Sequence, residues 1–116
     1  MSKFVKVIFS KDAWKSYQIL SHKAKRSKKE LIVFTALKQK IDLIHNNPSY
    51  GNQIPSRLIP KKYKQQDINN LFRVKLPCYW RMLYTITNKE EIRIIAFVLN
   101  IFNHKAYNKL MKYQNK

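Results

Sequence analysis

Residues 72–86 constrain the fold most, because apolar and polar side chains alternate along them with a period of two. Apolar residues fill the even positions from Phe72 to Leu76 and again from Trp80 to Ile86, and the residues between them are mostly polar or charged. Such a period is typical of strands with one buried face. The stretch therefore predicts a β-hairpin.

The length of the connection within this hairpin decides which side chains share a face of the sheet. A two-residue loop would pair Lys75 with Trp80 and would mix charge with the core. A three-residue loop at 77–79 pairs Lys75 with Arg81 and collects the apolar residues on the other face. We therefore expect the longer loop, with Arg73, Lys75 and Arg81 together on an exposed face.

The N-terminal half predicts a strand followed by two helices. Phe4–Phe9 is a β-prone run, and apolar residues of the segment after it return at helical spacing, from Ala13 to Ala24. Ser27 stands three residues before Glu30, as in a capping box that begins a second helix. This helix should end before Pro48. The tight basic turn between the two helices favours an antiparallel hairpin.

The remaining segments complete an α+β fold. Residues 48–69 have no sustained period and predict a long loop, residues 87–90 predict a turn, and residues 92–101 predict a strand covered on both faces. Residues 104–112 predict a short helix. We expect one domain over residues 1–116, with an N-terminal strand, a helix hairpin, a three-stranded antiparallel meander and a C-terminal helix.

The charge of the chain favours a polyanionic partner. Lys and Arg number 24 and Asp and Glu number 6, so the formal net charge is +18. Nucleic acid is the commonest partner of so basic a chain, because neutralised phosphates release condensed counterions. An acidic protein or an anionic membrane surface would also suit this charge.

The cysteine count and the apolar runs limit the cellular locations and the metal sites that we expect for this chain. Cys78 is the single cysteine, so an internal disulfide and a zinc site built on paired cysteines are excluded. The longest fully apolar run, Ile94–Leu99, is too short to span a bilayer, and Lys6 interrupts the N-terminal apolar stretch where a signal peptide needs an unbroken one. We expect a cytoplasmic protein without a metal, a cofactor or a membrane partner.

Three cations on one hairpin face suggest phosphate chemistry. Arg binds two phosphate oxygens through its planar guanidinium and Lys adds a point charge, which suits the phosphorane formed when a phosphodiester is cleaved. The alternative is a solvated basic face without a ligand.

Three segments together resemble the RelE/ParE superfamily of toxins from type II toxin–antitoxin systems. They are Asn70-Leu-Phe-Arg-Val-Lys-Leu-Pro, Tyr79-Trp-Arg-Met-Leu-Tyr-Thr-Ile and His104-Lys-Ala-Tyr. The resemblance implies a RelE-like fold and an endoribonuclease that cleaves mRNA, usually on the ribosome, when a 2′-hydroxyl attacks the adjacent phosphate. It also implies a cognate antitoxin as partner, and leaves a homodimer or a hetero-oligomer with the antitoxin open.

The resemblance also implies the catalytic residues. Arg73 and Lys75 take the basic positions of the first hairpin strand, Arg81 that of the second and Tyr107 the terminal one. Arg81 and Lys75 would stabilise the phosphorane, while His104 or Tyr107 would assist proton transfer or stack on a base. In the alternative interpretations His104 only opens the last helix and Tyr107 only packs.

Further cations fit RNA binding. Lys61, Lys62 and Lys64 surround Tyr63 in the predicted loop, which would hold RNA backbone and stack a base, unless it is simply solvated. The last strand lacks the basic residue that the family often has at its end, and Lys105 is the candidate replacement. Two alternatives therefore stay open: a ParE-like inhibitor of DNA gyrase, and a catalytically degenerate member that only binds nucleic acid or a partner.

Overall fold

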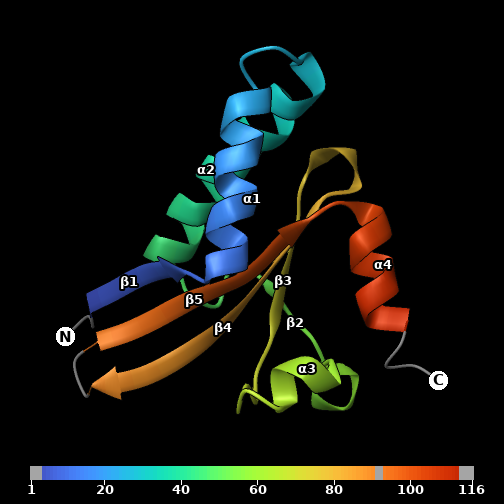
Figure 1. Ribbon diagram of the computed structural model, residues 1–116. Helices are drawn as coiled ribbons and strands as arrows, with labels where there is room; N and C mark the ends of the chain where they lie inside the picture. Colours follow the sequence, from blue (N-terminus) through green and yellow to red (C-terminus); the bar gives the residue numbers. More distant parts are fainter. Residues whose placement is uncertain (1–3, 91–92, 113–116) are drawn as a thin grey trace.

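The computed structural model describes residues 4–90 and 93–112 and contains a mixed five-stranded sheet (Figure 1). The strands are β1 (Phe4–Phe9), β2 (Asn52–Gln53), β3 (Phe72–Lys75), β4 (Arg81–Glu90) and β5 (Arg93–Phe102). Their order in the sheet is β1-β5-β4-β3-β2, with β1 parallel to β5 and the other neighbours antiparallel. The predicted α+β class and the antiparallel meander are confirmed.

Two long helices lie on one side of the sheet and two short ones on the other (Figure 1). They are α1 (Lys11–Lys23), α2 (Lys28–Asn46), α3 (Lys61–Lys64) and α4 (His104–Lys112). The Ser10 hydroxyl oxygen accepts the Ala13 N–H at 3.0 Å and so caps α1. Ser27 precedes α2 as predicted, but its hydroxyl donates to the Glu30 carboxylate and caps no backbone N–H. The predicted capping box is therefore not formed.

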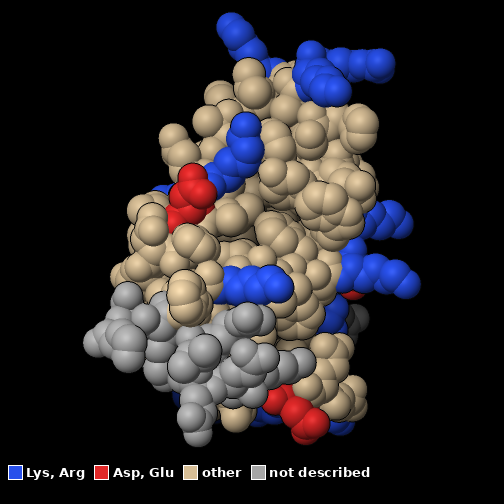
Figure 2. All heavy atoms as spheres, turned by 90° about the vertical axis from the view of Figure 1, so that its left-hand side faces the viewer, with Lys and Arg blue, Asp and Glu red and all other residues tan. Residues whose placement is uncertain are grey.

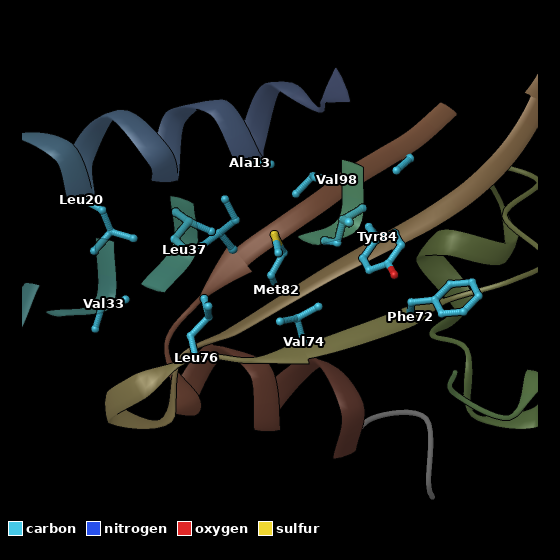
Figure 3. Close-up of a cluster of buried hydrophobic side chains, with 13 residues drawn as sticks. Ala13, Leu20, Val33, Leu37, Phe72, Val74, Leu76, Met82, Tyr84 and Val98 are labelled. Carbon is cyan, nitrogen blue, oxygen red and sulfur yellow. The ribbon is translucent and has the colours of Figure 1, made fainter. Parts of the chain in front are cut away.

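The first core lies between the sheet and the α1–α2 hairpin (Figure 3). Leu20, Val33 and Leu37 of the helices are at most 1% exposed and pack against even-numbered strand residues such as Met82 and Tyr84, which are fully buried. The alternation of residues 72–86 thus places its apolar side chains as predicted.

A second core covers the opposite face of the sheet, including the face of the β3–β4 hairpin that the sequence predicts to be exposed. Its buried members come from the segment 54–63, from the strands and from α4: Ile54, Ile59, Tyr63, Leu71, Leu83, Leu99 and Tyr107. The prediction failed because odd strand positions include both leucines and cations, and the leucines require a cover. The cationic side chains consequently lie at the border of an apolar layer.

The predicted turn at 87–90 is wrong, because these residues belong to β4 and Thr87 pairs with Ile95 of β5. The polar residues continue the strand here because β5 offers them main-chain hydrogen-bond partners. The predicted final strand is confirmed over Arg93–Phe102, with buried residues of both parities, such as Val98 and Leu99. Ile92 lies outside the described residues.

The basic turn between α1 and α2 forms one end of the molecule, where Lys and Arg side chains gather (Figure 2). The five cations of this turn are all exposed: Lys23, Lys25, Arg26, Lys28 and Lys29. Within the described residues, no helix is both long and apolar enough to cross a membrane.

Candidate functional site

The β3–β4 hairpin turns through residues 77–79, as the parity argument predicts. Lys75 pairs with Arg81, and the Leu76 N–H donates to the Trp80 carbonyl at 2.9 Å. Cys78 and Tyr79 adopt φ of 59° and 63°, left-handed values that cost non-glycine residues energy. The tight turn fixes the register that places the cations of both strands on one face.

Tyr107 stands between the two arginines of this face. Arg73 Nη1 donates a hydrogen bond to Tyr107 Oη at 3.3 Å, and Arg81 Cζ lies 5.8 Å from the centroid of the same ring. Arg81 Nη1 also donates to the Trp80 carbonyl at 2.8 Å, which restricts its guanidinium. The structure thus brings together three of the five predicted catalytic residues.

The start of α4 determines where Tyr107 lies. Asn103 Oδ1 accepts the Ala106 N–H at 2.9 Å, and the Asn103 carbonyl accepts the Tyr107 N–H at 3.0 Å. These bonds cap the helix directly after β5. Tyr107 is 8% exposed and meets Phe102 edge-on, with ring centroids 5.8 Å apart. Its packing role and its contact with the arginines therefore coexist.

Arg73 carries an unused hydrogen-bond donor. Its Nε is buried and has no partner among the described residues. A buried donor without a partner costs about 1–3 kcal/mol, and most such donors in native structures are satisfied. An anionic oxygen at this position would satisfy the donor. The Tyr107 hydroxyl accepts from Arg73, which leaves its own O–H available to donate to the same ligand.

The surroundings of the cluster are strongly cationic. Lys75 is exposed opposite Arg81 and adds a third positive charge. The acidic side chains that the structure describes lie on α1, on α2 and after α3: Asp12, Glu30, Asp42 and Asp67. None of these four lies on β3, β4 or α4. The cluster therefore suits an anionic group such as a phosphodiester.

His104 lies at the first position of α4 but its contacts are with other residues. Its Nε2 is 2.9 Å from Asn108 Nδ2, and its ring centroid is 5.4 Å from that of Tyr79. Among the described side chains, no hydrogen bond joins it to Arg73, Arg81 or Tyr107. His104 opens the last helix, in agreement with the alternative interpretation, and Lys105 next to it is exposed.

The predicted RNA-binding loop at 61–64 is a helical turn, α3, and Tyr63 is not available to a base. Tyr63 is 2% exposed, its hydroxyl donates to Asn100 Oδ1, and burial raises its pKa. The expectation that Tyr63 stacks on RNA is wrong, because its ring fills the second core. Lys61, Lys62 and Lys64 are exposed, as a solvated or RNA-binding surface requires.

A second cationic surface lies beside the cluster, and no pattern in the sequence predicts it. Lys40 of α2 and Tyr50 of the segment before β2 meet there, with Lys40 Nζ donating to Tyr50 Oη at 2.8 Å. The two residues are ten positions apart and belong to no periodic pattern. Only the fold brings them to the edge of β3, so no sequence signal was available.

Comparison with protein-family models, with curated proteins and with solved structures found no match to this chain. Among residues 4–90 and 93–112 there is also no group of three His, Cys, Asp or Glu side chains that would hold a metal ion. The functional inference therefore depends on the geometry of Arg73, Lys75, Arg81 and Tyr107.

Proposed function

We propose that the protein is the toxin of a type II toxin–antitoxin system and an endoribonuclease that cleaves mRNA. The observation that carries the proposal is the convergence of Arg73 and Arg81 on Tyr107, where the buried Arg73 Nε has no hydrogen-bond partner in the part of the chain that the structure describes. Two guanidinium groups and a phenol beside a free lysine fit the charge of a phosphorane.

The proposed reaction is transesterification within the RNA backbone. The 2′-oxygen forms a bond to the adjacent phosphorus, the bond from phosphorus to the 5′-oxygen breaks, and a 2′,3′-cyclic phosphate and a 5′-hydroxyl result. Arg73, Arg81 and Lys75 stabilise the charge on the non-bridging oxygens. Tyr107 donates its proton to the leaving 5′-oxygen, and the 2′-hydroxyl proton passes to water.

The fold and the partners follow the same proposal. We infer a RelE-like fold, which the order of strand, helix hairpin, meander and terminal helix supports. The net charge of +18 supports a ribosomal RNA environment and an antitoxin whose acidic segment covers the cluster.

The second candidate is a degenerate member that binds RNA without cleaving it. The position of His104 favours this candidate, because the one histidine near the hairpin contacts Asn108 and Tyr79 and leaves the cluster without a neutral base. Binding without cleavage would then use Arg73, Lys75 and Arg81 as phosphate contacts only.

The deciding experiment is induced expression in a bacterial host of the parent chain, of Arg81→Ala and of Arg57→Ala. Arg57 is an exposed arginine of the segment 56–58 and serves as the matched control for loss of one guanidinium. Primer extension on abundant transcripts detects cleavage, and a supercoiling assay with purified gyrase detects the ParE-like alternative.

The proposal predicts codon-phased cuts with the parent and with Arg57→Ala, and their loss with Arg81→Ala. Intact transcripts together with impaired gyrase would assign the protein to the gyrase inhibitors. Transcripts that are bound but uncut by the folded parent would establish the degenerate candidate. Cuts that persist with Arg81→Ala would refute the assignment of the catalytic site.

A further inference from the structure

A hollow of about 390 Å³ lies beside the candidate site, at the edge of β3. Seven residues from α2, from the segment before β2, and from β2 and β3 line it: Lys40, Tyr50, Gly51, Asn52, Arg73, Val74 and Lys75. The lining holds three cations, an aromatic ring and an amide, and no carboxylate. This combination differs from that of an apolar ligand pocket, which is lined mostly by hydrophobic side chains.

Hydrogen bonds to Tyr84 hold the segment 48–51, which forms part of the lining of the hollow. Gly51 donates its N–H to Tyr84 Oη at 2.9 Å, and Tyr84 Oη donates to the Pro48 carbonyl at 2.6 Å. A Cβ at Gly51 would lie 2.9 Å from Tyr84 Cε1 and 3.1 Å from the Arg73 carbonyl oxygen, so only glycine allows this close approach. The buried phenol of Tyr84 thereby fixes the chain next to Tyr50.

Lys40 and Tyr50 meet in the lining of the hollow. Lys40 Nζ donates to Tyr50 Oη at 2.8 Å and lies 5.3 Å from the centroid of the ring. Tyr50 is 37% exposed, in contrast to the buried Tyr63. An aromatic ring held at the surface beside a lysine is the arrangement on which single-stranded nucleic acids stack a base while a phosphate meets the cation.

The hollow and the candidate site share β3. Arg73 and Lys75 line the hollow, and the same two residues belong to the cluster with Arg81. Strand β2 pairs only with Phe72 and Arg73, so no strand among the described residues covers the edge of β3 at Lys75. A single RNA strand that crosses this edge would contact the cluster and the hollow with successive nucleotides.

We propose that the hollow binds the nucleotide next to the scissile phosphate of single-stranded RNA. Its base stacks on Tyr50, its phosphate contacts Lys40, and Asn52 supplies polar contacts to the base. The inference rests on the proposed function, since it assigns the hollow to the same RNA substrate. It adds a binding subsite in which Lys40, Tyr50 and Asn52 contact the RNA and take no part in bond breaking, while Arg73 and Lys75 are shared with the cluster.

The test uses the full chain and a fluorescein-labelled, fully 2′-O-methylated single-stranded RNA, which has no 2′-hydroxyl nucleophile. The variants are Tyr50→Ala, Tyr50→Phe, Lys40→Ala and, as matched control, Lys38→Ala. Lys38 is an exposed lysine of α2 that contacts Phe34, and residues two apart on a helix face different directions. Fluorescence anisotropy gives Kd at several salt concentrations, and circular dichroism checks that each variant is folded.

We expect Tyr50→Ala to weaken binding about fivefold or more, because base stacking on an aromatic ring contributes at least this much. Tyr50→Phe keeps the ring and should bind as the parent does. Lys40→Ala should lower the slope of log Kobs against log salt by about 0.7, as expected for one lost phosphate contact. Lys38→Ala should leave both Kd and the slope unchanged.

Two negative results are distinguishable. If the parent binds the RNA and cleaves its unmodified form, while Tyr50→Ala and Lys40→Ala bind like Lys38→Ala, the subsite is wrong and the proposed function stands. If the parent neither binds the modified RNA nor cleaves the unmodified one, free or on ribosomes, the proposed function fails and the RNA subsite fails with it. Equal weakening by Tyr50→Phe and Tyr50→Ala would overturn the stacking contact.

Discussion

Replacing Tyr107 by Phe separates packing from chemistry at the candidate site. The change removes one hydroxyl, which accepts the hydrogen bond from Arg73 at 3.3 Å, and leaves the ring in place against Phe102 and Arg81. A hydrogen bond to a charged group contributes about 1.5–3 kcal/mol net to stability, and a bond as long as this one contributes less, about 1 kcal/mol. We therefore expect a loss of about 1 kcal/mol, which lowers Tm by about 4 °C in a domain of this size.

The expected effect on cleavage is much larger. A positioned general acid contributes about 10²- to 10⁴-fold to the rate, so Tyr107→Phe should lower kcat at least a hundredfold while the RNA still binds. Tyr107→Ala is a poorer probe, because removing a large buried aromatic costs about 3–5 kcal/mol, a large fraction of the stability of a typical domain.

The assay is single-turnover cleavage of a substrate that the parent cuts, alongside thermal unfolding and RNA binding for the same preparations. A hundredfold slower reaction with Kd unchanged and Tm lowered by a few degrees agrees with proton donation by Tyr107. A variant that is equally stable and cuts at the parental rate would show that the Tyr107 hydroxyl takes no part in the reaction. Another group would then have to donate the proton to the leaving 5′-oxygen.

Three further changes test contacts beside the hollow, in the second core and at the start of α2. Gly51→Ala should destabilise the protein by about 1–3 kcal/mol in a urea titration, because the new Cβ would lie 2.9 Å from Tyr84 Cε1. Tyr63→Phe should cost about 1–3 kcal/mol, since the Asn100 amide oxygen loses its donor, and RNA affinity measured by anisotropy should not change. A hydrogen bond from a serine hydroxyl lowers the pKa of Glu30, so its contribution to stability is present above about pH 4.5 and is lost as the pH falls through the lower folded pKa. Glu30→Gln should make this acid-side loss of stability smaller in pH-dependent unfolding.

The hairpin that carries the cluster was predictable because the pattern that specifies it lies within one short segment of the sequence. The alternation from Phe72 to Ile86 decides the parity of the connection, and parity alone places Lys75 opposite Arg81. The apolar runs and helix boundaries of the other main elements are similarly local signals. The turn predicted at 87–90 failed for the opposite reason, because the pairing of β4 with β5 depends on a partner that local composition does not reveal.

The second core could not be predicted from local sequence patterns, because its members come from distant segments of the chain. Its presence changes the environment of the cationic cluster. The lysines on either side of Tyr63 favour an exposed ring in a loop. The ring instead packs in the same core as Leu83 and Leu99, because burying a large aromatic side chain is energetically favourable. The same cover brings Tyr107 against Arg73, which a fully exposed hairpin face would not do. A solvated cluster of like charges would be only a repulsive surface. Partial burial beside Tyr107 lowers the local dielectric, and Arg73 Nε has no partner there among residues 4–90 and 93–112. An incoming phosphate therefore gains more here than at the exposed lysines of α3.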